Sequence, residues 1–192
     1  AKGKKQASSQ LKPTLSNKKL FDASKTEPDT AVGAAMSLLS APFVQKGATQ
    51  EARMGIACAF VAFARGIQRA QLEHYADYIL SQLIHMILAV PAAGRQVQDC
   101  VSHAMRAGLG ETLSERGQSA MAVALATTAT ARATAEPAVV VCLREVSSLL
   151  FNLREVATGA RDALTRGDQP LVLLAEHPSP AVSFAARSCL WS

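Results

Sequence analysis

The sequence predicts an all-α fold in which antiparallel helical hairpins follow one another as a solenoid, and three observations predict it. The chain has 192 residues, of which 49% are hydrophobic and 5% aromatic. This composition, rich in alanine in the second half, suits helix-on-helix packing better than a sheet sandwich. Apolar residues recur at steps of three and four along most of the chain, as they do on helices. The predicted helix starts also recur at a nearly constant interval.

Residues 1–25 are predicted to form a flexible basic linker. Residues 1–20 contain six lysines and no acidic residue, whereas the whole chain has a formal charge of +5. The remaining residues are therefore close to neutral. The net positive charge of the chain lies in its amino-terminal tail rather than on a binding face. Lysine, serine and proline in this proportion cannot bury enough apolar surface to offset chain entropy. The six lysines are Lys2, Lys4, Lys5, Lys12, Lys18 and Lys19.

Two helical segments follow the linker. A short helix is expected from about Pro28 to a break at Ala41-Pro42, because proline suits the first turn of a helix and interrupts a later one. Residues 50–90 are expected to form a helical hairpin with a tight break at Arg69-Ala70 and an end at Pro91. The apolar stripe of the first helix in this hairpin consists of Met54, Ala57, Val61 and Ala64.

The hairpin is expected to recur twice more. Gly108 and Gly110 are expected to end the opening helix of the first recurrence, and Pro137 opens the second. A fourth unit is expected to begin at Pro180, because a proline-rich start followed by small residues suits a helix that packs closely on its neighbour. The helices of the two recurrences are predicted at residues 96–108, 112–132, 137–153 and 168–176.

The spacing of the helix starts distinguishes a solenoid from a closed helical bundle, which would also have periodic apolar residues. Starts at Glu51, Gln96, Pro137 and Pro180 are separated by 45, 41 and 43 residues, within the range of about 40–47 residues typical of HEAT and armadillo repeats. Residues 26–192 are therefore predicted to be a HEAT-repeat segment of about three full repeats plus the start of a fourth.

The chain is expected to be a fragment of a longer array. It begins without methionine and stops at Trp191-Ser192, inside an apolar pattern. A helix cut off within a repeat array leaves apolar surface that the next helix would cover. The exposed apolar end is expected around Val182, Phe184, Ala185 and Leu190.

No catalytic, cofactor-binding or metal-binding residues are predicted, and the chain is not expected to be an enzyme. The sequence has no Walker loop, no HExxH pair and no GxSxG nucleophile elbow. Cys100 and His103 lie one helical turn apart and could supply two metal ligands, but a structural zinc site needs four. Packing is therefore the favoured interpretation. Gly108-Leu109-Gly110 follows a helix rather than a strand, which favours helix termination over a dinucleotide loop.

The four cysteines are expected to be buried, unpaired and free of metal, as in reduced cytosolic proteins, because each lies in its own apolar helical pattern. Tyr75 and Tyr78 are either exposed anchors for a partner or core residues with their hydroxyl groups at the rim, and the second interpretation is favoured. Neither a signal peptide nor a membrane span is predicted. The cysteines are Cys58, Cys100, Cys142 and Cys189.

Four stretches of the sequence carry a resemblance to a known family. They are Glu51-Ala52-Arg53-Met54-Gly55-Ile56, Leu72-Glu73, Val140-Val141-Cys142-Leu143-Arg144-Glu145 and His177-Pro178-Ser179. Read in order, they resemble the HEAT-repeat-containing protein 5 family, the large accessory protein of the clathrin adaptor complex. The resemblance covers residues 30–192. The sequence departs from the family pattern at Ser183, where the pattern has arginine, at Ser188, where it has tryptophan, and at Trp191, where it has a basic residue.

The resemblance implies a non-catalytic scaffold segment that acts in clathrin-adaptor-dependent membrane traffic between the trans-Golgi and endosomes. It implies that the partners are proteins, namely the clathrin adaptor complex and its accessory subunits. It also implies a cytoplasmic location, with peripheral and indirect association with trans-Golgi and endosomal membranes, and it leaves open a homo-oligomer of the longer protein. No site residues carry over from the family.

Two alternatives stay open at this point. One is a HEAT-repeat scaffold of another pathway, such as nuclear transport or kinase and phosphatase assembly. The other is a helical nucleic-acid-binding protein that uses its basic tail. The near-neutral charge of the remaining chain favours protein partners over nucleic acid.

Overall fold

The structure is a computed structural model that describes residues 30–90, 94–152 and 158–192. Every regular element in these residues is helical and none is a strand, so the all-α prediction is confirmed. The predicted linker of residues 1–25, the helix start at Pro28 and the helix end at Pro91 lie outside the described residues. The elements are α1 (Thr30–Val44), α2 (Gln50–Gly66), α3 (Arg69–Ala89), α4 (Arg95–His103), the π-helix η2 (Ala104–Gly110), α5 (Glu115–Thr130), α6 (Glu136–Asn152), α7 (Thr158–Arg166), α8 (Leu171–Ala175) and α9 (Pro180–Trp191).

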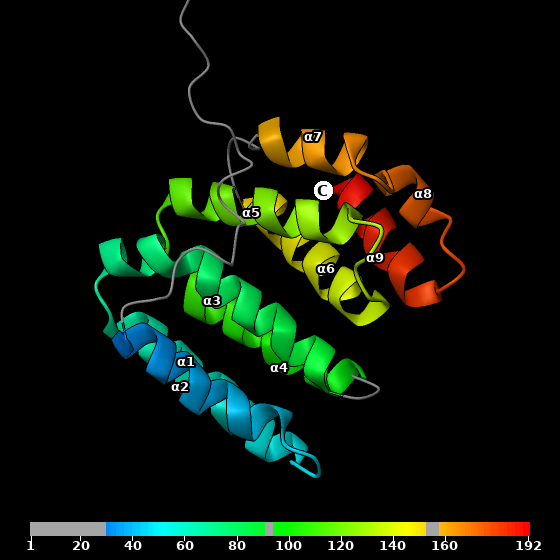
Figure 1. The fold of residues 1–192 in the computed structure, drawn as a ribbon. Helices are drawn as coiled ribbons and strands as arrows, with labels where there is room; N and C mark the ends of the chain where they lie inside the picture. The colour runs from blue at the N-terminus through cyan, green and yellow to red at the C-terminus, as the bar shows by residue number, and fades with distance from the viewer. Residues whose placement is uncertain (1–29, 91–93, 153–157) are drawn as a thin grey trace, which may run out of the picture.

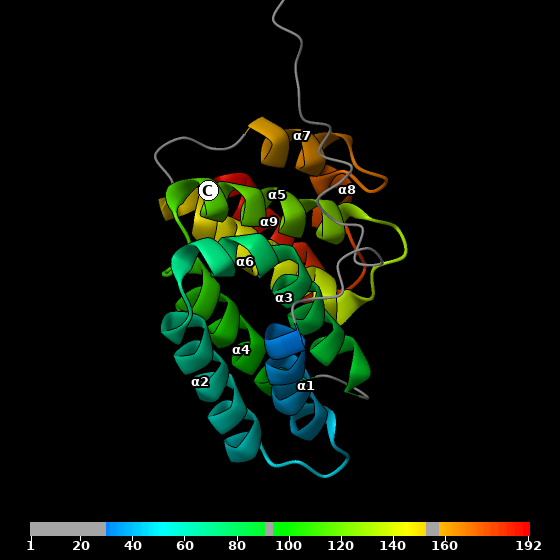
Figure 2. The ribbon, with the colours of Figure 1, turned by 60° about the vertical axis from the view of Figure 1, so that its left-hand side comes forward.

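The described helices form two layers (Figure 1). In the first layer α2 packs against α4 and η2, these pack against α6, and α6 packs against α9. In the second layer α1 packs against α3, α3 against α5, and α5 against α7. Figure 2 shows the succession from α1 and α2 at one end of the molecule to α7 and α8 at the other. The core fills the space between the layers, and its largest fully buried side chains include Phe43, Phe60, Leu109, Leu125 and Leu143.

The pairing of consecutive helices differs from the predicted hairpins. The close pairs are α1 with α2, α3 with α4, α5 with α6, and α8 with α9. The sequence predicted instead that the two helices of residues 50–90, now α2 and α3, would form a hairpin. An apolar period fixes the interval between units but not the helix at which a unit begins. The predicted pairs are therefore displaced by one helix.

Local sequence explains where several helices begin. The Thr49 side chain accepts a hydrogen bond from the backbone N–H of Ala52 at the start of α2, at 3.2 Å. The Ser114 side chain accepts one from the N–H of Gly117 at the start of α5, also at 3.2 Å. Both bonds satisfy N–H groups that a helix leaves without a partner in its first turn. Pro180 opens α9, as predicted, because its missing N–H is not needed there.

The predicted break at Ala41-Pro42 is wrong, since α1 continues through Pro42 to Val44. Proline removes a backbone donor and disturbs the preceding turn, but here only the end of the helix follows it. The next residue, Phe43, is fully buried, and its carbonyl accepts a hydrogen bond from Nε of Arg53 at 3.0 Å. Burial and this bond hold the last turn in helical form.

Two other predicted breaks are displaced or only partly correct. Arg69 and Ala70 are the first residues of α3, and the break falls at Ile67 and Gln68. Of the two glycines expected to end the next helix, Gly110 is the last residue of η2, as predicted, whereas Gly108 lies inside η2. A glycine at this position instead permits a close approach between helices, since a Cβ atom on Gly108 would lie 2.6 Å from Cε1 of Phe60.

The region after α6 contains a helix that the sequence does not predict. Residues 158–166 form α7, which has two buried residues, Ala160 and Leu164, one turn apart. So narrow an apolar stripe gives a weak periodic pattern. The helix predicted at residues 168–176 is the shorter α8 (Leu171–Ala175).

Substituting Gly108 with alanine is expected to destabilise the protein by about 1–3 kcal/mol, because the added methyl group meets the buried ring of Phe60. Its nearest neighbours would be Cε1 and Cδ1 of Phe60 at 2.6 and 3.1 Å, followed by Cβ of Ala64 at 3.5 Å. The matched control is Gly55→Ala in α2, where the added Cβ meets no atom within 4 Å beyond its chain neighbours and the backbone of its own helix. The gain in helix propensity should there stabilise the protein by about 0.5–1 kcal/mol. Urea unfolding of both variants measures the difference. Equal shifts of the same sign would contradict the close packing of Gly108.

Candidate protein-binding surface

Arginine side chains connect neighbouring helices of the first layer. Arg65 of α2 donates from Nε to the carbonyl of Ala107 at 3.2 Å and forms an ion pair with Glu111. Arg106 of η2 forms a two-bond ion pair with Glu145 of α6, with distances of 2.8 Å from Nε and 3.0 Å from Nη2. Arg144 of α6 reaches back to Asp99 of α4 at 2.9 Å. These contacts fix each helix against the next.

The Arg106–Glu145 pair is the most buried of these contacts. The side chain of Glu145 is 1% exposed, while that of Arg106 is half-exposed at 50%. The hydrogen bond to Glu145 raises the pKa of the Arg106 guanidinium. Because both carboxylate oxygens accept bonds from Arg106, the pair is suited to holding two helices together rather than to transferring a proton.

The polar contacts between successive helices share a common sequence separation. The arginine contacts of Arg65 with Glu111, Arg106 with Glu145 and Arg144 with Asp99 join residues 46, 39 and 45 positions apart. Farther along the chain, the Ser147 hydroxyl bonds the carbonyl of Ser188, 41 positions away, and the Cys189 thiol bonds the carbonyl of Leu143, 46 positions away. The first layer is thus joined at a nearly regular step.

The structure corrects one prediction for the cysteines. All four are free, and Cys100, Cys142 and Cys189 are buried, but Cys58 is exposed. Burial raises the pKa of the Cys142 and Cys189 thiols to about 12, so these two groups stay protonated. Cys58 lies on the solvent side of α2, next to Ala59, which is exposed as well.

The His103 side chain lies beside that of Cys58. Its Nε2 atom is 4.0 Å from the Cys58 sulfur, whereas Cys100 is buried in the core. Within residues 30–90, 94–152 and 158–192, no group of three or more histidine, cysteine, aspartate or glutamate side chains has the arrangement to hold a metal ion. In this part of the chain, Cys100 and His103 are therefore not joined by the further ligands that a metal site would need.

The two tyrosines of α3 pack at the edge of the core. Tyr75 and Tyr78 are both half-buried and contact the buried cluster. The ring of Tyr75 lies edge-on to the ring of His74, with centroids 4.7 Å apart. This placement agrees with the packing interpretation rather than with that of exposed anchors.

Asp77 of α3 borders a small cavity of about 60 Å³ whose other walls include Leu80, Leu109 and Met121. Burial raises the pKa of Asp77 from 3.8 to about 6. A carboxyl group whose pKa is higher in the folded state than in the unfolded state destabilises the folded state at pH values above its folded-state pKa. This destabilisation disappears as the pH falls toward the unfolded-state pKa.

Asp77→Asn is therefore expected to stabilise the protein by about 1–2 kcal/mol near pH 8 and by about zero near pH 4. The value at pH 8 is smaller than the full pKa difference implies, because water reaches this partly exposed carboxyl group. Urea unfolding of wild type and variant at several pH values measures the difference. Asp162→Asn, at an exposed aspartate of α7, serves as the control for the substitution itself. A difference between wild type and Asp77→Asn that does not change between the two pH values would contradict the burial of a charged carboxylate.

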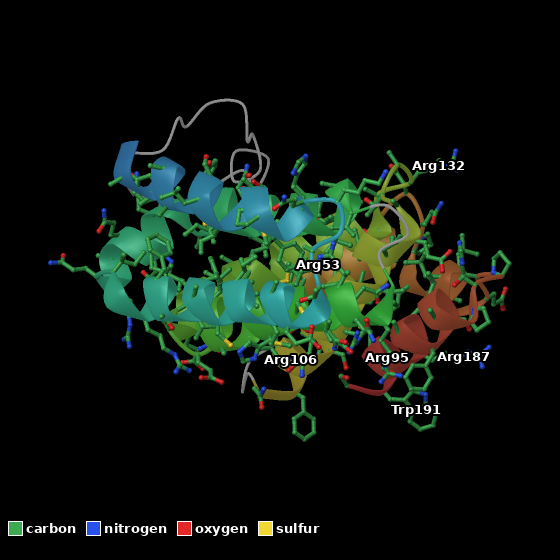
Figure 3. All side chains as sticks on the ribbon, turned by 90° about the horizontal axis from the view of Figure 1, so that it is seen from below. Arg53, Arg95, Arg106, Arg132, Arg187 and Trp191 are labelled. Atoms are coloured by element: carbon green, nitrogen blue, oxygen red, sulfur yellow. The ribbon has the colours of Figure 1, made fainter. Side chains whose placement is uncertain are left out.

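Exposed apolar side chains gather on α6, α8 and α9. The predicted apolar end is only partly correct, because Val182 and Ala185 are buried while Phe184 and Leu190 are exposed. Val182 and Ala185 face the interior, where α9 packs on α6 and α8. Trp191, which is 91% exposed, projects away from the ribbon near Arg187 (Figure 3). The exposed apolar residues of these three helices are Phe151, Val172, Leu173, Phe184, Leu190 and Trp191.

A cavity of about 860 Å³ lies at the opposite end of the molecule, where the turn between α1 and α2 approaches the ends of α3 and α4. Basic side chains reach it from three segments, namely Lys46 from the turn, Arg53 from α2 and Arg95 from α4. Its apolar walls include Val44, Val90 and Val97. We call it the basic cavity.

None of the protein-family models, curated proteins or solved structures compared with the chain matches it. Across the described ranges, the helices are either too short or too polar to cross a membrane.

Proposed function

We propose that this chain is a non-catalytic scaffold segment, built as a HEAT-type α-solenoid, that holds other proteins. The observation that carries the proposal is the regular step of the first layer. Polar contacts between successive helices there join residues 39 to 46 positions apart, close to the length of a HEAT repeat.

A solenoid suits scaffolding because each unit packs on its neighbours and the stack presents a long surface. The two ends of this molecule differ in chemistry. One has the basic cavity, and the other has exposed aromatic side chains at Phe184 and Trp191. Exposed aromatic residues and arginines are the side chains that contribute most to protein interfaces. Two chemically distinct surfaces on one segment would let it hold two partners.

The pathway that we propose is clathrin-adaptor-dependent traffic between the trans-Golgi and endosomes, with a cytoplasmic location peripheral to those membranes. Its support is the sequence resemblance between residues 30–192 and the HEAT-repeat-containing protein 5 family. Membrane association would then be indirect, through the adaptor complex and its accessory subunits.

Affinity capture of the full-length protein, with identification of the recovered partners, tests this function. Adaptor subunits are expected among the partners, and depletion of the protein is expected to disperse the adaptor. Recovery of transport receptors or of kinase or phosphatase subunits instead would reject the adaptor pathway and keep the scaffold. Recovery of no protein partner would reject the scaffold itself.

A further inference from the structure

We propose that the basic cavity binds an acidic segment of a partner protein, in which carboxylate side chains flank an apolar one. This inference rests on the proposed scaffold function and names the chemistry of one partner.

The cavity is large enough for several side chains of a peptide. Its volume of about 860 Å³ lies within the range of about 300–1,000 Å³ found for ligand pockets. Its described lining comes from four stretches of the chain, which are residues 44–47, Arg53, residues 89–90 and residues 94–97. These stretches belong to helices of both layers.

The charge of the cavity is one-sided. Lys46, Arg53 and Arg95 line it, and no acidic residue occurs among its described lining residues. Arg95 has one acidic neighbour, Asp99, at 3.7 Å, and its side chain is 87% exposed. Asp99 makes its shorter contact, of 2.9 Å, with Arg144. Arg95 is therefore available to an incoming carboxylate, since so exposed a pair contributes little.

Arg53 is held in place at the cavity wall. Its Nε donates to the carbonyl of Phe43 at 3.0 Å, and its guanidinium carbon lies 6.0 Å from the centre of the Phe43 ring. A guanidinium carries five N–H donors, and this bond uses one of them. A fixed guanidinium loses little entropy on binding a carboxylate. Figure 3 shows Arg53 and Arg95 on neighbouring helices of the first layer.

The amino-terminal end of α4 adds to the positive potential. Gly94 precedes the helix and provides no side-chain cap, and the first backbone N–H groups of a helix have no partner within it. Arg95 and Gln96, which carry two of these groups, both line the cavity. The partial positive charge at a helix start favours an anion there.

The walls favour a peptide over a free phosphate, a lipid headgroup or a nucleic acid. Val44 and Ala89, which are half-buried, give the cavity an apolar side, to which the largely buried Val90 and Val97 add small exposed areas. A phosphate group would use the cations and leave these valines unused, whereas a peptide can place an aliphatic side chain against them. No aromatic residue lines the described part of the cavity, so it offers no stacking surface for bases.

The test is fluorescence anisotropy of the full chain with a short labelled peptide in which glutamates flank a central valine. The double variant Lys46→Glu/Arg95→Glu is expected to weaken binding at least about tenfold, because it reverses two of the charges that complement the peptide. Both side chains are exposed, so the fold is not expected to change, and circular dichroism checks this.

The matched control is Arg132→Glu/Arg166→Glu, which changes the net charge by the same amount at two exposed arginines that do not line the basic cavity. Arg166, like Arg95, has an aspartate four positions away on its helix, at 3.9 Å. The control is expected to bind the peptide with an affinity close to that of the wild type. Equal weakening in both variants, or equal binding of a peptide with glutamine in place of glutamate, would overturn the proposal.

Three further outcomes separate the occupants and the two proposals. Inorganic phosphate and vesicles of anionic lipid are tested as competitors of the labelled glutamate peptide. If either displaces this peptide at a concentration at which the glutamine peptide does not, a peptide site is rejected. Loss of one set of captured partners from Lys46→Glu/Arg95→Glu, but not from the control variant, would support the cavity. Capture of the same partners by wild type and by Lys46→Glu/Arg95→Glu would reject the cavity and leave the scaffold function standing.

Discussion

Replacing Phe60 with alanine is expected to lower the free energy of unfolding by about 3–5 kcal/mol, because a large cavity opens where the fit is closest. Phe60 is 1% exposed, and its ring lies between α2 and the π-helix, against Gly108. The surrounding helices cannot collapse into the space without moving the ion pairs that hold them together. Urea unfolding followed by circular dichroism measures the loss.

The matched control is Phe63→Ala, in the next turn of α2. Phe63 is half-buried, and its ring centre lies 6.5 Å from that of Phe60. Because less of its surface leaves water on folding, its truncation is expected to cost less than that of Phe60. Similar losses at the two positions would contradict the placement of Phe60 in the tightest part of the core.

A double variant tests the same contact from the other side. The methyl group introduced by Gly108→Ala clashes with the Phe60 ring, so it is expected to cost little once the ring is absent. Phe60→Ala/Gly108→Ala should therefore be more stable than the sum of the two single losses predicts. Simple additivity would show that the ring and the glycine are not in contact.

The second large effect is expected at Arg106, where substitution by methionine should cost about 3 kcal/mol. The variant leaves Glu145 without its partner while 1% exposed, and an unpaired buried charge is far more costly than an absent one. The value lies at the lower end of the usual range because Arg106 is half-exposed and water can approach from its side. The control, Arg95→Met, removes an arginine that is 87% exposed, and should change stability by less than about 0.5 kcal/mol.

Removing both members of the pair should restore most of the stability. In Arg106→Met/Glu145→Met no charge remains buried, and two flexible apolar side chains fill the same space. Unfolding of the single and double variants gives their interaction energy. If the double variant is as unstable as Arg106→Met alone, the ion pair stabilises the protein more than the two methionines do. That result would contradict this expectation.

The sequence predicts the helices well because their positions depend on local chemistry. Apolar steps of three and four residues, the caps at Thr49 and Ser114, and Pro180 at the start of α9 all act within one or two turns. The helix through Pro42 was missed because the burial of Phe43 comes from tertiary packing. Helix α7 was missed because two buried residues, Ala160 and Leu164, give little periodicity.

The candidate site is beyond sequence reasoning for a different reason. Lys46, Arg53 and Arg95 form no motif, and the folded part of the chain is close to neutral overall. They line one cavity because the fold brings the ends of four helices together. The step of 41 to 45 residues between helix starts indicated which segments would be neighbours, but it did not indicate which faces would meet. The burial predicted for Cys58 was wrong for the same reason, because the sequence does not indicate which face of α2 packs against its neighbours.

The regular step of the first layer also bears on how the chain is made. The polar contacts described between its successive helices join residues no more than 46 positions apart. At a synthesis rate of about 5–20 residues per second, a helix would wait only about 2–9 seconds for its next partner to be translated. The basic cavity is lined by residues between 44 and 97. Its walls are therefore complete before α6 and α9 leave the ribosome, and the acidic segment that we propose could bind while the rest of the chain is still being synthesised.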